Sequence, residues 1–408
     1  MNAFEQHLDE RLAEIRQNHL YRKNRRIDSA QGAQLEIDGN TILNFSSNDY
    51  LGLANHPALK AAAIEAIERY GAGAGASRLI CGSLAPHHQL EEALVEFKGT
   101  EAALTFATGY AAALGTICSL AGKDDVIVID KLVHACIVDA AKLSGAKLRV
   151  FRHNDLNDLE GILQWTSSLP RNTQHATRTL IVTESIFSMD GDHAPLREIV
   201  QLKDKYGAWL MVDEAHATGL YGQHRRGLAE QLGVSGQIEI QMGTLGKALG
   251  AAGGYICGSQ ELIDYLVNRA RPFIFSTAPV PAAVAAAAAG IRLVKSVEGE
   301  ARRNTLWQRV SDLKLKLNIQ ASNIPAAIIP LHIGGEARAI EVAAALLDKN
   351  ILIPAVRYPT VARGKARLRL TVNAAHTPAQ IQLLASALRH WLPEFNNVTS
   401  INEHSGQT

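Results

Sequence analysis

The chain has 408 residues, of which 41 are Lys or Arg and 40 are Asp or Glu, so its formal charge at pH 7 is +1. This length exceeds the usual size of a single hydrophobic core and favours an enzyme of two or more domains. The balanced charge, without a long run of one sign, argues against nucleic acid or an anionic membrane as a partner.

The N-terminal segment and the cysteines predict a cytoplasmic protein. The first residues carry Glu5, Asp9 and Glu10 and have no continuous apolar core, unlike a signal peptide. No stretch has the length and apolar character that a bilayer span needs. The four cysteines lie far apart, with no Cys-x-x-Cys pair, as in a reduced protein without a metal site.

Residues 1–56 are predicted to form an N-terminal arm. Within 4–20 the apolar residues recur every three or four positions, which predicts an amphipathic helix. The segment 34–45 has the character of a β-hairpin.

Residues 57–290 are predicted to form a large α/β domain. Seven short apolar segments alternate with helical stretches, which is typical of a mainly parallel sheet covered by helices on both faces. The predicted strands are 103–106, 125–130, 148–151, 179–184, 209–213, 238–242 and 254–257. In such sheets ligands collect at the carboxyl ends of the strands.

Residues 291–408 are predicted to form a smaller α+β domain. It begins with a long polar helix at 298–316, and strands are expected at 326–333, near 351 and at 367–372. The alternation of the preceding domain ends here, which marks a domain boundary.

Asp213 and Lys247 point to the chemistry. Asp213 ends the apolar run 208–212, and Lys247 lies in the small-residue segment 243–250. A lysine amine forms a Schiff base with an aldehyde cofactor, and a buried carboxylate keeps a pyridine nitrogen protonated. This combination suggests an enzyme that uses pyridoxal 5′-phosphate (PLP).

The segment Asp213-Glu-Ala-His216 also resembles the Asp-Glu-Ala-His box of nucleotide-driven helicases. That interpretation needs a phosphate-binding loop of the form Gly-x-x-x-x-Gly-Lys-Ser/Thr. Gly246 and Lys247 are followed by Ala248, and the position five before Gly246 is Gln241, so the loop is absent from the chain. The helicase interpretation is therefore rejected.

Further candidates stand where strands end or helices begin. Gly109 and Tyr110 open a small-residue helix after Thr108, where backbone N–H groups favour a phosphate, although a simple Thr cap fits equally well. His134 and His216 each follow a strand that ends in Asp. Either histidine alone is more often structural. Two histidines alongside Asp213 and Lys247 leave the structural and the catalytic interpretation equally open.

The arginines cannot be ranked by pattern alone. Arg22 lies in the basic run 21–26, which is either a solvated helix end or a contact for a phosphorylated substrate. Arg357 and Arg369 flank a turn in the C-terminal domain, and each has the chemistry to hold a carboxylate by two hydrogen bonds. The choice between them stays open on this ground.

Seven motifs in this order resemble those of the α-oxoamine synthases, a family of PLP enzymes that join an amino acid to an acyl-CoA with loss of carbon dioxide. The motifs include Asn44-Phe-Ser-Ser-Asn-Asp-Tyr-Leu-Gly52, Asp213-Glu-Ala-His216 and Thr244-Leu-Gly-Lys247, and the others are 75–78, 108–110, 184–192 and 367–370. The resemblance covers nearly the whole chain. It implies a PLP-dependent transferase of fold type I, aspartate aminotransferase-like, that works as a homodimer with a shared active site.

The resemblance also implies a role for each candidate residue. Lys247 would hold PLP, Asp213 would pair with the ring nitrogen, His216 would bond the ring hydroxyl and His134 would stack on the ring. The phosphate would lie near Thr244, Gly109 and Tyr110, with Thr277 reaching the phosphate of the neighbouring subunit. The amino-acid adduct would contact Asn48, Glu184 and Ser188, and its carboxylate would bind Arg369.

Members of this family differ in the amino acid and the acyl chain that they use. The segment 45–52 and Arg357 are similar to the member of the biotin pathway that joins L-alanine to a pimeloyl thioester, delivered as CoA or carrier-protein thioester. Segments 243–250 and 271–276 instead resemble the member that uses glycine and acetyl-CoA. We predict the first activity. Synthases for lipid or haem precursors, and a non-catalytic relative that binds a partner, are the alternatives, and the last would not need Lys247.

Overall fold

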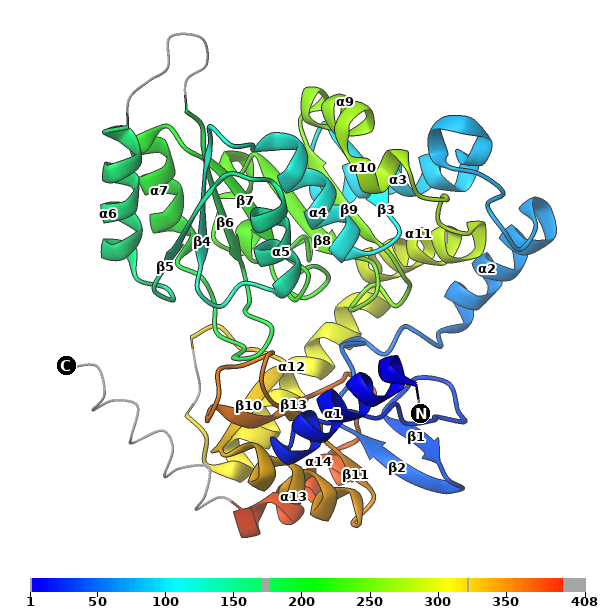
Figure 1. Cartoon of the computed structure of the whole chain (residues 1–408). Helices are drawn as coiled ribbons and strands as arrows, with labels where there is room; N and C mark the ends of the chain where they lie inside the picture. The colour runs from blue at the N-terminus through cyan, green and yellow to red at the C-terminus, as the bar shows by residue number, and fades with distance from the viewer. Residues whose placement is uncertain (1, 170–176, 321–322, 392–408) are drawn as a thin grey trace. The chain divides into compact units, whose positions relative to one another are not determined.

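The computed structural model describes residues 2–169, 177–320 and 323–391. The chain divides into two compact units (Figure 1). The smaller unit comprises Met1–Tyr50, Met189–Gly191 and Asn304–Thr408, and the larger unit comprises Leu51–Ser188 and Asp192–Arg303. The end of the predicted C-terminal domain, 392–408, lies outside the described residues.

The larger unit is built on a seven-stranded sheet of order β3-β9-β8-β7-β6-β4-β5. Strands β8, β7, β6, β4 and β5 are parallel, whereas β9 is antiparallel to both β8 and β3. The expected mainly parallel seven-stranded sheet is thus confirmed. The strands are β3 Ala102–Phe106, β4 Val126–Asp130, β5 Lys147–Phe151, β6 Thr179–Glu184, β7 Trp209–Asp213, β8 Ile240–Thr244 and β9 Gly254–Gly258.

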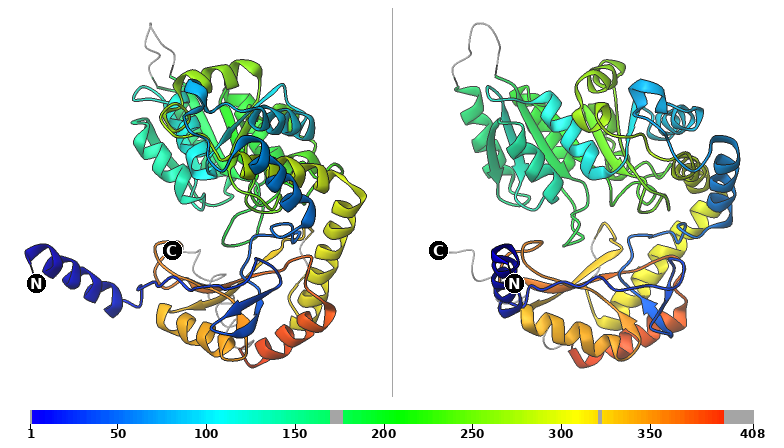
Figure 2. Two further views of the ribbon diagram at one scale, coloured as in Figure 1. Left: turned by 90° about the vertical axis from the view of Figure 1, so that its right-hand side faces the viewer. Right: turned by 45° about the vertical axis from the view of Figure 1, so that its right-hand side comes forward.

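Helices cover both faces of this sheet, as Figures 1 and 2 show. Because both faces are covered, every residue of β3, β4 and β9 is buried, which explains why these strands are mainly apolar rather than alternating between apolar and polar residues. The helices are α2 Pro57–Tyr70, α3 Ala85–Lys98, α4 Gly109–Leu120, α5 Ala135–Leu143, α6 Leu156–Ser167, α7 Leu196–Tyr206, α8 Leu228–Gln231, α9 Gln260–Arg269, α10 Arg271–Ile274 and α11 Pro281–Lys295.

The smaller unit contains two three-stranded sheets, of order β1-β2-β11 and β10-β13-β12. Strand β2 pairs in parallel with β11, so the predicted N-terminal arm shares a sheet with the C-terminal part of the chain and belongs to its unit. Its elements are α1 Ala3–Gln17, β1 Gln34–Ile37, β2 Asn40–Asn44, β10 Ile328–Gly334, α13 Glu336–Leu347, β11 Ile351–Leu352, β12 Ala355–Val356, β13 Ala366–Thr371 and α14 Pro378–Leu388.

Two helices of this region stand out. Helix α12 (Val297–Leu317) contains the boundary between the units, and a stripe of buried residues with spacings of three and four follows that boundary: Leu306, Val310, Leu313 and Leu317. Helix α1 buries none of its residues and projects from the smaller unit (Figure 2). Among the described residues, the helices lack the combination of length and apolar character required to cross a membrane.

Candidate functional site

The carboxyl ends of four neighbouring parallel strands each carry a polar side chain. Asp130 ends β4, Glu184 ends β6, Asp213 ends β7 and Thr244 ends β8. Parallel strands place these ends at one edge of the sheet, where ligands bind in open α/β folds. The site expected from the sequence therefore has a defined location in the larger unit.

Two buried carboxylates lie side by side at this edge. Glu184 and Asp213 are direct partners in the pairing of β6 with β7, and they are 2% and 5% exposed. Burial, followed by the neighbouring charge of Asp213, raises the pKa of Glu184 well above its ordinary value. Burial also raises the pKa of Asp213, although nearby Lys247 lowers it. The two neighbouring carboxylates therefore oppose each other's ionisation.

Each carboxylate also organises the backbone around it. Asp213 Oδ1 accepts the N–H of Ala215 at 2.8 Å, at the start of the turn that leads to His216. Glu184 Oε2 accepts the N–H of Ser188 at 3.2 Å, and the carboxylate also bonds the backbone N–H of His134. Glu184 Oε1 is buried without a hydrogen-bond partner, an arrangement expected of a group that meets a ligand.

Lys247 lies directly against His216. The distance from Lys247 Nζ to His216 Nε2 is 2.8 Å. A tight turn after β8 presents the lysine, and within it Gly250 adopts φ +70°, where a Cβ would lie 2.7 Å from the carbonyl carbon of Leu53. The glycine is required there both by its backbone conformation and by this close approach.

His134 caps the N-terminus of α5, where its Nδ1 accepts the N–H of Cys136 at 3.2 Å. Because Nδ1 is thus an acceptor, the ring is fixed in orientation, and the residue is exposed. An aromatic face held at the edge of the sheet is suited to stacking on a flat cofactor ring.

The N-terminus of α4 borders the end of β8. Thr108 caps this helix through the N–H of Ala111 at 3.0 Å, which leaves the N–H groups of Gly109 and Tyr110 for a ligand. A Cβ built on Gly109 would lie 3.9 Å from the Cβ of Thr244, so the helix start and Thr244 are neighbours. Phosphate binding at this place is consistent with both the helix dipole and the free N–H groups.

The donor set in the larger unit fits PLP. Burial raises the pKa of Asp213, and a cationic pyridine nitrogen beside this carboxylate would lower that pKa again. Lys247 supplies the amine, and the start of α4 supplies N–H donors for the phosphate. Among the described residues there is no cluster of His, Cys, Asp and Glu arranged to bind a metal ion.

The remaining predicted site residues are placed as follows. Thr277 is exposed and forms a bridge with Ser77. In the smaller unit, Asn48 accepts a hydrogen bond from Tyr50 Oη at 3.4 Å, and buried Arg369 donates to Thr371 Oγ1 at 3.1 Å. The substrate roles expected for these residues stay predictions.

Arg22 and Arg357 hold the backbone together within the smaller unit. Arg22 donates to the carbonyl of Tyr358 at 2.9 Å, and Arg357 donates to the carbonyls of His19 and Tyr21. These bonds tie the segment after α1 to the turn after β12. Both arginines thus have a structural role, and their contact with substrate stays a prediction.

A buried ion pair missed by the sequence reasoning supports the turn that carries His216. Lys98 Nζ lies 2.7 Å from Glu214 Oε2, and both side chains are almost fully buried. Burial lowers the pKa of Lys98, but the attraction of Glu214 outweighs it and the pKa is raised. Glu214 Oε1 accepts the N–H of Ala229 at 2.9 Å, so the pair anchors both ends of the segment 214–229.

Replacing Lys98 by Met is expected to destabilise the protein by about 3–5 kcal/mol, because Glu214 would keep a buried charge without its partner. The free energy of unfolding from urea titration measures this loss. The double variant Lys98→Met/Glu214→Gln, which removes both charges and keeps an acceptor for Ala229, should recover most of it. A loss below about 1 kcal/mol in the single variant would argue against a strong pair.

Known proteins match nearly the whole of this chain. The family model for aminotransferase class I and II matches residues 40–388. The 8-amino-7-oxononanoate synthase of Geotalea daltonii is 45% identical over 384 residues, covering 93% of this chain and 96% of that protein.

Solved structures give the same fold. The serine palmitoyltransferase of S. paucimobilis, with PLP bound, has a TM-score of 0.87 at 30% identity, covering 98% of this chain and 100% of that one. The 8-amino-7-oxononanoate synthase of Francisella tularensis has a TM-score of 0.71 at 27% identity, covering 86% of this chain and 98% of that one. The chain belongs to the aminotransferase class I and II family and, within it, to the α-oxoamine synthases.

Proposed function

We propose that this protein is a PLP-dependent acyltransferase that condenses L-alanine with a pimeloyl thioester, releasing carbon dioxide and the thiol, as an 8-amino-7-oxononanoate synthase of biotin biosynthesis. The observation that carries the proposal is the 45% identity to a protein of that name over nearly the full length of both chains. Other relatives with the same name, from Geobacter sulfurreducens among them, match at similar identity.

The likeness to serine palmitoyltransferase ranks second. Its TM-score of 0.87 compares backbones, and a family in which all members share one reaction scaffold keeps that backbone whatever the substrate. Side chains determine the substrate. The sequence identity is 30% to this serine palmitoyltransferase and 45% to the 8-amino-7-oxononanoate synthase of Geotalea daltonii. Condensation of glycine with acetyl-CoA is the third candidate, supported by the segments 243–250 and 271–276.

The proposed roles follow from the contacts at the sheet edge. PLP, when bound, withdraws electrons from the amino acid Cα, so that first a proton and later the carboxylate can leave. Asp213 would place a negative charge against the ring nitrogen, and His134 would stack on the ring. Lys247 Nζ, 2.8 Å from His216 Nε2, would hold the cofactor and, once released, would be placed to accept the Cα proton. Glu184 would contact the bound amino acid.

A homodimer with a shared active site is part of the proposal. Large apolar side chains are exposed in this chain, including Phe4 on α1, Ile80, and Phe275 two residues before Thr277, with exposures of 70%, 79% and 70%. Exposed apolar surface of this kind supports burial against a second copy. The proposal places the protein in the cytoplasm, in keeping with its four free cysteines.

The test is to load the purified protein with PLP and to measure turnover with each pairing of L-alanine, glycine or L-serine with pimeloyl-CoA, acetyl-CoA or palmitoyl-CoA. Alanine with pimeloyl-CoA should give the highest kcat/KM by more than about tenfold, because a specific pocket separates substrates by 1–3 kcal/mol per methylene. One carbon dioxide should appear per CoA released. Preference for glycine with acetyl-CoA, or for serine with palmitoyl-CoA, would replace the proposed substrates and keep the reaction class.

A further inference from the structure

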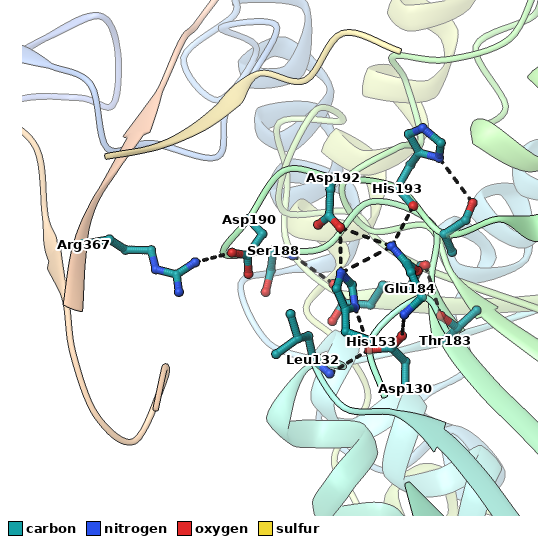
Figure 3. A network of polar contacts seen from close by, with 12 residues as sticks. Asp130, Leu132, His153, Thr183, Glu184, Ser188, Asp190, Asp192, His193 and Arg367 are labelled. Atoms are coloured by element: carbon teal, nitrogen blue, oxygen red, sulfur yellow. Dashed lines mark hydrogen bonds and ion pairs between the residues drawn. The ribbon is translucent and has the colours of Figure 1, made fainter. Parts of the chain in front are cut away.

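His153 occupies a position that none of the expected roles explains. It lies two residues after β5, between two carboxylates, as Figure 3 shows. Its Nδ1 lies 2.9 Å from Asp130 Oδ1, and its Nε2 lies 2.6 Å from Asp192 Oδ2. Asn154 Nδ2 lies farther from Nε2, at 3.3 Å. Both ring nitrogens thus have a carboxylate oxygen as their nearest partner, and a doubly protonated imidazole donates to both.

The charge state of the imidazole agrees with this geometry. Burial lowers the pKa of His153, but the bonds to Asp130 and Asp192 outweigh it and raise the pKa to about 10. The Asp130 side chain is fully buried, so the imidazolium is the cation that makes its charge tolerable. The neighbouring Arg152 is paired with Asp155 and Asp158 instead.

One carboxylate holds the turn that carries His134. Asp130 Oδ1 accepts the N–H of Leu132 at 2.8 Å, and this turn runs directly into the cap of α5. Asp130 Oδ2 accepts the N–H of Asn154 at 2.9 Å. The end of β4 is therefore bonded both to the turn before His134 and to the segment of His153 (Figure 3).

The other carboxylate belongs to the hairpin that carries Ser188 and connects it to His153. Residues 185–194 form this hairpin, since the N–H of Phe187 bonds the carbonyl of Asp192 at 2.9 Å and the N–H of Ala194 bonds that of Ser185 at 3.1 Å. The ring of Phe187, the residue before Ser188, packs edge-on against His153 with centroids 4.4 Å apart.

We propose that His153 is a positioning residue for the reaction: through its bonds to Asp130 and Asp192 it locks the turn 131–134 and the hairpin 185–194 in one arrangement, so that His134 and Ser188 are held together around the cofactor. The inference rests on the proposed function for the roles of these two residues. In this proposal His153 acts through these two segments and not on the reacting atoms. Glu184 also bonds the backbone of both segments, so the turn and the hairpin are connected through Glu184 as well as through His153.

Two variants separate the two bonds. His153→Asn keeps an amide nitrogen near the position of Nδ1, so it retains donation to Asp130 and loses Asp192. His153→Gln places its amide near Nε2, so it retains Asp192 and loses Asp130. His193→Asn is the matched control, because it removes an imidazole from the same hairpin without touching either carboxylate.

Hydrogen exchange of the full chain, with and without PLP, measures how the loss of each bond changes the protection of the hairpin and of the turn. We expect faster exchange confined to 185–194 in His153→Asn and to 131–134 in His153→Gln, with the strands of the sheet protected as in the wild type. The kcat should fall between about tenfold and a hundredfold in both, because a shift of about 1 Å in a positioned group has that cost. The KM for the acyl thioester should change by less than about twofold, and His193→Asn should match the wild type.

The pH dependence of stability supplies a reading independent of turnover. The charged groups that face the imidazole are Asp130 and Asp192, and they raise its pKa in the folded protein from 6.5 to about 10. The stability that His153 adds is thus complete below about pH 6.5 and is lost as the pH rises toward 10. The difference in unfolding free energy between wild type and His153→Asn should shrink across this window.

Exchange that is unchanged in both variants, or that rises evenly over the sheet, would overturn the proposal, as would a kcat equal to that of His193→Asn. These readings remain separate from the substrate assignment. Exchange and stability are measured without substrate, so a different amino acid preference leaves them intact.

Discussion

Lys247→Ala is expected to abolish both turnover and the visible absorption of PLP-loaded protein. The amine is the group proposed to hold the aldehyde and to take the Cα proton, and loss of a positioned base alone lowers kcat by up to about 10⁴-fold. Because the covalent link is lost as well, we expect a fall of at least this size. The folded structure should persist, since the Lys247 side chain is only half-buried and lies against His216 in the turn after β8.

Borohydride reduction followed by peptide mapping measures the link directly. In the wild type the cofactor should be found on the peptide that contains Lys247, and in Lys247→Ala no reducible band should remain. Lys142→Ala is the control, since this exposed lysine in the last turn of α5 belongs to the same unit and takes no part in the site. A reducible visible band that survives in Lys247→Ala would assign the cofactor to another lysine.

The edge of the sheet that carries Glu184, Asp213 and Thr244 could be predicted from the sequence, because it depends on local apolar pattern and on strand direction. A run of apolar residues ending in Asp213 predicts a buried strand, and parallel strands end at one edge, so Glu184 and Asp213, which end the predicted strands 179–184 and 209–213, belong to the same edge. The structure confirms that the two are direct neighbours across β6 and β7. Strand β8 was expected at 238–242 and lies at Ile240–Thr244, because Glu239 turns its carboxylate to the N–H of Leu210 and to Lys203 before the strand begins.

Long-range ion pairs could not be predicted in this way. Lys98 and Glu214 are 116 residues apart, and no periodicity links them. His153 is 39 residues from Asp192, and its own signal was only that it follows a strand, as His134 does. Charged residues in such segments are usually solvated, so pattern alone favours the wrong environment for all of them.

The arginines illustrate the same limit. Sequence pattern left Arg357 and Arg369 equivalent, because each stands near a turn and a strand of the C-terminal domain. The structure separates them: Arg357 donates to backbone carbonyls of the N-terminal segment, whereas Arg369 is buried in β13 beside Thr371. Neighbouring Arg367 is buried and paired with Asp190.

Asp213→Asn is expected to lower kcat by about 100- to 1000-fold while PLP still binds and still absorbs in the visible. The amide has the shape of the carboxylate and can accept the N–H of Ala215, but it carries no charge to keep the ring nitrogen protonated. Asp213→Glu, which retains the charge, should keep more activity than the amide. A kcat for Asp213→Asn within about threefold of wild type would remove Asp213 from the proposed chemistry.

The same substitution should raise the stability of the cofactor-free protein. Burial raises the pKa of Asp213 in the folded state above its ordinary value of 3.8, so the folded protein binds its proton more tightly than the unfolded chain does. Stability therefore falls as the pH rises above 3.8, and at pH 7 the ionised carboxylate is a cost that the amide removes. Thermal unfolding of the cofactor-free protein at pH 7 should show a higher Tm for Asp213→Asn, whereas an unchanged or lower Tm would mean that the charge is already compensated by Lys247. A gain in Tm together with a loss in kcat would mark Asp213 as a residue kept for the reaction at the expense of the fold.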